Sequence, residues 1–63
     1  MSSELLELME KIRRSEEEVK QGYERIINDC IEENIIREFK FLWQQKTEHL
    51  EEIDDIISSL SIH

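Results

Sequence analysis

The chain has 63 residues, and its 16 acidic and 8 basic side chains give a formal net charge of −8. This charge argues against nucleic-acid and anionic membrane partners, because both would repel the chain. The sequence has no apolar run of the ~20 residues that a membrane span needs, and its first residues, MSSELLELMEK, lack the features of a signal peptide. With a single cysteine, a cytoplasmic location is expected.

The small size of the chain calls for an additional source of stability. One cysteine cannot form a disulfide within the chain. A domain this short is marginally stable alone, so a second copy or a bound metal is the expected support.

Residues from about 3 to 31 are predicted to form the first helix, because Glu, Leu, Lys and Arg are abundant and proline is absent. Its side chains form two columns spaced alternately three and four residues apart, as in an interhelical a/d interface. The columns are Leu5, Ile12, Val19, Ile26 and Met9, Glu16, Tyr23, Cys30. The polar stretch RRSEEE (13–18) interrupts this apolar stripe near its middle.

The phase of the apolar residues breaks near EEN, which predicts a turn at about 32–34, with Asn34 as a capping or left-handed residue. The second helix is expected over about 35–60. Its columns are Ile36, Trp43, Leu50, Ile57 and Phe39, Lys46, Ile53, Leu60, with Ile35, Leu42, His49 and Ile56 beside them. So short a connection forces the helices to be antiparallel; a single long bent helix is the alternative.

The predicted fold is therefore all-α: one domain over residues 1–63, folded as an antiparallel two-helix hairpin. Each helix of such a hairpin keeps an apolar face open to water, and burial of those side chains favours association. We expect the hairpin to dimerise into a four-helix bundle.

Folding at 32–34 places position i of the first helix opposite about 66 minus i, so Tyr23 faces Trp43. Glu16 then lies opposite Leu50 and His49, with Lys46 one turn away. A carboxylate in the bundle needs a partner. One interpretation is an ionic layer of Glu16 with Lys46 or His49 that fixes the register. A metal site and simple extension of the charges into water are the alternatives.

Residues 16–57 carry a Gly-Tyr pair (22–23), a short acidic turn and a second helix containing EHLEEI (48–53). This pattern resembles the ferritin-like superfamily, in particular small bacterial two-helix ferritin-like domains of unknown function and, more distantly, rubrerythrin. The resemblance implies an antiparallel helix pair that completes a four-helix bundle with a second copy. In active members it also implies iron binding and ferroxidase or peroxide chemistry.

The ligands implied by this resemblance are only partly present. His49 matches the family's histidine, but the glutamate expected three residues earlier is replaced by Lys46. Glu16 or Glu24 corresponds to the carboxylate of the first helix. Glu52 or Glu48 could substitute as a ligand, so the resemblance implies a possible iron site of Glu16, His49 and Glu52. An ammonium at position 46 would repel a dication, which favours a scaffold without the chemistry or a mononuclear site.

Two broad functions follow. The first is a small acidic helical scaffold or interaction module that acts as a homodimer without catalysis. The alternative is a ferritin-like iron protein with oxidoreductase chemistry. A possible docking point for another protein is Phe41 with Lys40 and Arg37, because Phe41 falls on the outer face of the second helix. The segment 58–63 could also act as a docking peptide.

Overall fold

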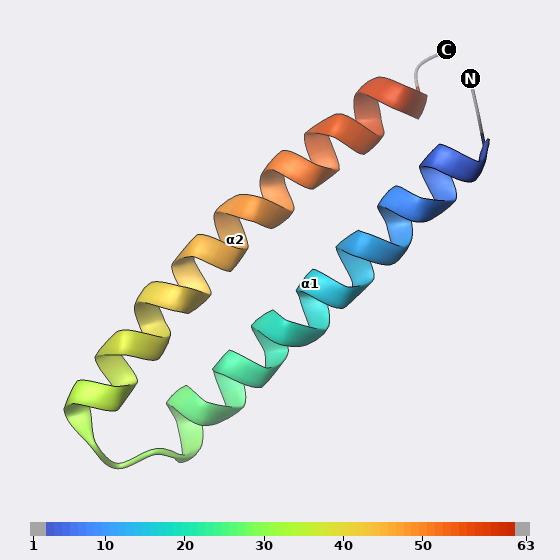
Figure 1. Ribbon diagram of the computed structural model, residues 1–63. Helices are drawn as coiled ribbons and strands as arrows, with labels where there is room; N and C mark the ends of the chain where they lie inside the picture. Colours follow the sequence, from blue (N-terminus) through green and yellow to red (C-terminus); the bar gives the residue numbers. More distant parts are fainter. Residues whose placement is uncertain (1–2, 62–63) are drawn as a thin grey trace.

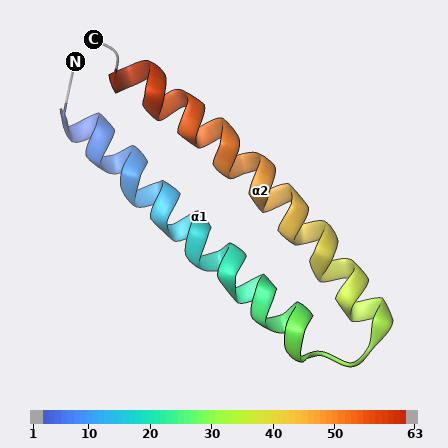
Figure 2. The same ribbon diagram turned by 180° about the vertical axis from the view of Figure 1, so that it is seen from behind.

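The computed structural model describes residues 3–61, which form two antiparallel helices (Figure 1). Helix α1 spans Ser3–Asp29 and helix α2 spans Glu33–Ser61. The two helices lie side by side along their whole length, and the view from behind in Figure 2 agrees. The predicted all-α hairpin is confirmed, and the alternative of a single bent helix is wrong.

Residues 30–32 connect the two helices, two residues earlier than the turn predicted at 32–34. The backbone N–H of Cys30 still donates to the carbonyl of Ile26 at 2.9 Å, and the carbonyl of Glu32 already accepts from Ile36 at 3.0 Å. Asn34 therefore lies inside the first turn of α2. No residue between 3 and 61 has the left-handed conformation that was considered for it.

The hairpin is a thin rod with almost no interior. Its Cα atoms extend over 48 × 15 × 11 Å, and their radius of gyration is 14.7 Å. A compact domain of this length would have a radius of gyration of about 11 Å. Leu50, which is 5% exposed near the middle of α2, is the one buried side chain among the described residues. Most of the apolar side chains are thus only half covered by the opposite helix.

The columns predicted for α2 do face α1, and so does the α1 column that contains Met9, Glu16, Tyr23 and Cys30. The prediction that the second α1 column also faces α2 was wrong within the hairpin. Leu5, Ile12, Val19 and Ile26 lie beside the helix–helix interface and are 38–44% exposed. The half-buried side chains in their place are Leu6, Arg13, Lys20 and Ile27.

Contacts between the helices define their register. The Tyr23 and Phe39 rings are 5.7 Å apart between centroids, so Tyr23 contacts Phe39 where Trp43 was expected. Residue numbers of this pair sum to 62, and those of other contacting pairs sum to between 62 and 67. The predicted sum of about 66 lies within this range: Arg13–Asp54 and Glu24–Trp43 match it within one residue, and Tyr23–Phe39 differs from it by about one helical turn.

Neither helix within residues 3–61 has an apolar stretch that could cross a bilayer.

Candidate interaction surface

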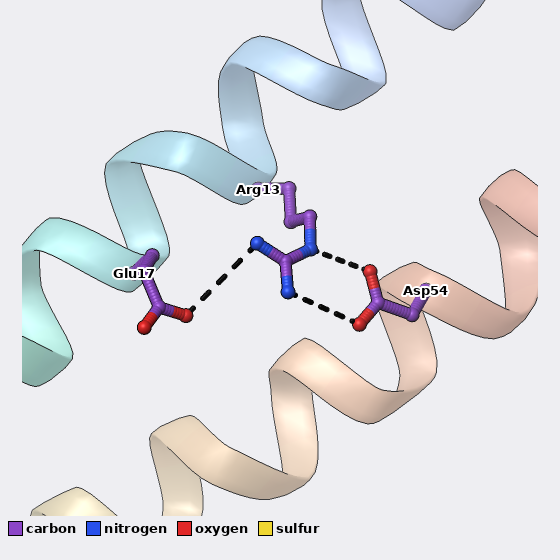
Figure 3. Close-up of polar contacts among 3 residues, drawn as sticks. All are labelled: Arg13, Glu17 and Asp54. Atoms are coloured by element: carbon purple, nitrogen blue, oxygen red, sulfur yellow. Dashed lines mark hydrogen bonds and ion pairs between the residues drawn. The ribbon is translucent and has the colours of Figure 1, made fainter.

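One edge of the hairpin is lined by charged side chains, and we call it the charged edge. Arg13 donates from Nε to Asp54 Oδ1 at 2.5 Å and from Nη2 to Asp54 Oδ2 at 3.3 Å (Figure 3). Its third nitrogen, Nη1, lies 4.0 Å from Glu17. The hydrogen bond from Arg13 lowers the pKa of the Asp54 carboxyl below its ordinary value, and the positive charge adds to this effect. This two-pronged pair connects α1 to α2 on one side.

Nearer the turn, the charged edge is centred on Trp43. Its indole N–H donates to Glu24 Oε1 at 2.9 Å, and the Lys20 ammonium lies 5.0 Å from its ring centroid. Both contacts bring an α1 side chain across the edge onto α2. A shallow groove of about 450 Å³ lies beside the tryptophan. The groove is lined by Glu24, Ile27, Asn28, Lys40, Trp43 and Gln44.

The polar layer predicted near mid-length is present as an ion pair between Glu16 and Lys46. Lys46 Nζ lies 2.5 Å from Glu16 Oε2, and the two side chains are 19% and 29% exposed respectively. The carboxylate oxygen is buried, and the contact lacks the alignment of a hydrogen bond. The lysine charge is therefore the main compensation for burying this oxygen.

The side of the hairpin that carries Glu16 and Lys46 is bordered by apolar columns on both helices. At 100° per residue, the α1 column that contains Ile12 lies next to Glu16, and the α2 column that contains Leu42 lies next to Lys46. Both columns therefore flank the same side, opposite to the charged edge. We call this side the open face. Its flanking columns are Leu5, Ile12, Val19, Ile26 and Ile35, Leu42, His49, Ile56.

The open face is apolar but accessible. Ile12, Val19 and Ile26 are 41%, 43% and 38% exposed, and Ile56 is 49% exposed. Single exposed apolar residues are ordinary on protein surfaces, but two aligned columns on adjacent helices make a contiguous patch, and such patches mark interaction sites. Glu16, Lys46 and the exposed His49 are the polar side chains near its centre.

Two further residues lie outside the flanking columns: Gly22 next to the column of Ile12, and Phe41 on the outer face of α2, 100° around the helix from Leu42. Phe41, the suggested docking point with Lys40 and Arg37, is 61% exposed, and both of its basic neighbours are also exposed. Gly22 is the one glycine of the chain and lies within α1. A Cβ atom placed there would meet nothing within 4 Å. The hairpin alone gives no packing reason for a glycine at this position.

The residues of the suggested iron site do not form a metal-binding cluster within one chain. Among residues 3–61, no three His, Cys, Asp or Glu side chains are arranged to hold an ion. Glu16 is paired with Lys46, while His49 and Glu52 are exposed. A site built from Glu16, His49 and Glu52 would need further ligands from a second chain, and it stays a prediction.

Comparison with models of protein families, with curated proteins and with solved structures gave no match. The resemblance to the ferritin-like superfamily therefore also stays a prediction.

Proposed function

We propose that the protein is a small acidic scaffold whose working form is a homodimer, made when two hairpins pack through their open faces into a four-helix bundle. The observation that carries the proposal is the pair of half-exposed apolar columns that flank one side of the hairpin. A side chain 40% exposed in the hairpin would become buried against a second copy. Burial of apolar area is the main favourable term in such an association.

The surface area of the hairpin supports this proposal. The chain exposes 5033 Å². A folded monomer of its mass exposes about 4,300 Å² on average. The difference, on the order of 700 Å², is close to the roughly 800 Å² that each partner buries in a standard protein interface. A hairpin with one buried side chain thus needs about as much additional burial as one interface supplies.

The Glu16–Lys46 pair gives the proposed interface a specific register. It lies at the middle of α1 and close to the middle of α2. In a dimer, two such pairs form a polar layer at mid-length. A register slip would place charged groups against aliphatic side chains of the other copy, which is costly. The layer thereby opposes slipped or larger assemblies, as polar core positions do in coiled coils.

Sedimentation velocity over a dilution series tests the proposal. The wild-type chain is expected to sediment as a dimer at micromolar concentration. Ile12→Glu places a charge in the open face and should weaken association by at least a hundredfold, because the carboxylate would lose its water on pairing. A stable, folded wild-type monomer at tens of micromolar would refute the homodimer.

The matched control is Ile31→Glu. Ile31 is 93% exposed in the connection between the helices. The same chemical change there should leave the dissociation constant within about twofold, since exposed substitutions away from contacts have small effects. Equal weakening by both variants would show that the open face is not the interface.

A further inference from the structure

A dimer closed through the open face has two possible two-fold symmetric forms. In the first, the symmetry axis runs parallel to the helices, α1 packs on α2 of the second copy, and both turns lie at the same end. In the second, the axis runs across the helices, like helices pack together, and the turns lie at opposite ends. We infer that the chain adopts the first form, the same-end dimer, in which Lys11 and Arg25 of each copy are level with Glu52 and Glu38 of the other. This inference rests on the homodimer proposed above.

Symmetry fixes the register of the same-end dimer. Rotation about an axis parallel to the helices leaves the height of every residue along that axis unchanged. Residues that are level within one hairpin are therefore also level between the two copies. The contacts within the hairpin join residues whose numbers sum to between 62 and 67. Pairs between α1 of one copy and α2 of the other must follow the same rule.

Charged side chains outside the flanking columns of the open face favour the same-end dimer. Lys11 is level with Glu52 of the other copy, and Arg25 is level with Glu38, because both pairs sum to 63. Symmetry doubles them to four opposite-charge pairs around the interface. Such pairs contribute little affinity individually, but they select between alternative pairings.

The opposite-end dimer lacks this complementarity. At full overlap, Lys11 would be level with residues 21–22 of the other α1, which carry no negative charge. Glu38 would be level with residues 58–59 of the other α2, which carry no positive charge.

The position of the turn in the dimer distinguishes the two forms. A chain with Cys30→Ser and Ile31→Cys carries its single thiol at an exposed position in the connection, where a nitroxide label disturbs no contact of the hairpin. Pulsed electron paramagnetic resonance then measures the distance between the two labels. The same-end dimer should give less than about 30 Å, since helices in a bundle lie about 8–10 Å apart. The opposite-end dimer should give about 45 Å or more, because each helix is ~40 Å long.

Each outcome has a separate meaning. A long distance would overturn the same-end form and leave the homodimer standing. No dipolar signal at concentrations where sedimentation also shows a monomer would overturn both proposals.

Variants at the proposed contacts provide an independent check. Lys11→Glu should weaken dimerisation roughly threefold, and adding Glu52→Lys should restore the wild-type value. Arg14→Glu, the same charge change on the back of α1, is the control and should have little effect. Unchanged dimerisation in Lys11→Glu would overturn the inference, because the same-end form places residue 11 level with Glu52.

Discussion

The two sides of this hairpin are joined by ion pairs of different kinds. On the charged edge, Arg13 and Asp54 form a two-pronged pair whose side chains are 39% and 49% exposed. Across the rod, Glu16 and Lys46 form a pair that is largely shielded from water. The first pair is surrounded by other polar side chains. The second is bordered by the aliphatic columns of the open face.

This difference indicates which side of the hairpin remains exposed to solvent. Polar side chains such as Glu24 and Lys20 cover Trp43 on the charged edge, so its apolar surface needs no further partner. Nothing comparable covers Ile12 or Val19 on the open face. The side chains of Glu16 and Lys46, already mostly buried in one chain, would be buried further in a dimer. The asymmetry between the sides is therefore an argument for association through one of them.

The largest expected effect on stability comes from truncating Leu50, the buried side chain between the two sides. Leu50 is 5% exposed and lies between the two ion pairs in α2. Leu50→Ala should lower the free energy of unfolding by about 2–4 kcal/mol, through lost burial and the cavity left behind. Urea denaturation at a fixed chain concentration measures this, since the stability of a dimer depends on concentration. A loss below about 1 kcal/mol would show that Leu50 is not central to the packing.

A smaller effect is expected from breaking the shielded ion pair. Lys46→Met should lower the free energy of unfolding by about 1–3 kcal/mol, because it leaves the buried oxygen of Glu16 without a compensating charge. Glu16→Leu combined with Lys46→Met should recover most of this loss, since an apolar pair fits the surrounding columns. The same urea titration applies to both variants.

The double variant also tests the proposed role of the polar layer in fixing the register. It should broaden the distribution of oligomers in sedimentation, because nothing polar would then oppose a slipped pairing. A double variant that is as stable as the wild type and still strictly dimeric would argue against that role.

Much of the fold follows from the spacing of apolar residues. The two helices, their antiparallel direction and the facing columns of α2 could all be predicted, because a 63-residue chain with no proline and one phase break has few alternatives. The position of the turn could not be fixed to the residue. Cys30, Ile31 and Glu32 are all compatible with a helix, and no glycine or proline marks the end of α1.

The error in α1 has a physical cause. Arg13 and Lys20 face α2, where columns chosen from apolar residues left no place for charged side chains. Their aliphatic stems pack along the interface while the charged ends reach Asp54 and the Trp43 ring. Arg13 and Lys20 are seven residues apart, opposite Asp54 and Trp43 of the second helix. This spacing is the signal that could have shown that the two cations face α2. By contrast, the Glu16–Lys46 pair could be predicted, because the polar interruptions of the two helices coincide.

The smallest expected effect concerns the exposed ion pair and its dependence on pH. The folded chain holds the pKa of Asp54 below its ordinary value of 3.8, chiefly through the hydrogen bond from Arg13. The pair therefore contributes its full stability above the ordinary pKa and loses it as the pH falls through the lowered value. Asp54→Asn should be less stable than the wild type at pH 7, and the two should converge as the pH falls through the lowered pKa of Asp54. Added salt should also narrow the difference at pH 7, since exposed pairs are screened. Urea titrations from pH 7 to pH 2.5, with Glu51→Gln as an exposed carboxylate control, measure it. A difference that stays constant over this range would mean that position 54 acts through packing, and that the charged edge does not depend on the charge of its best-defined pair.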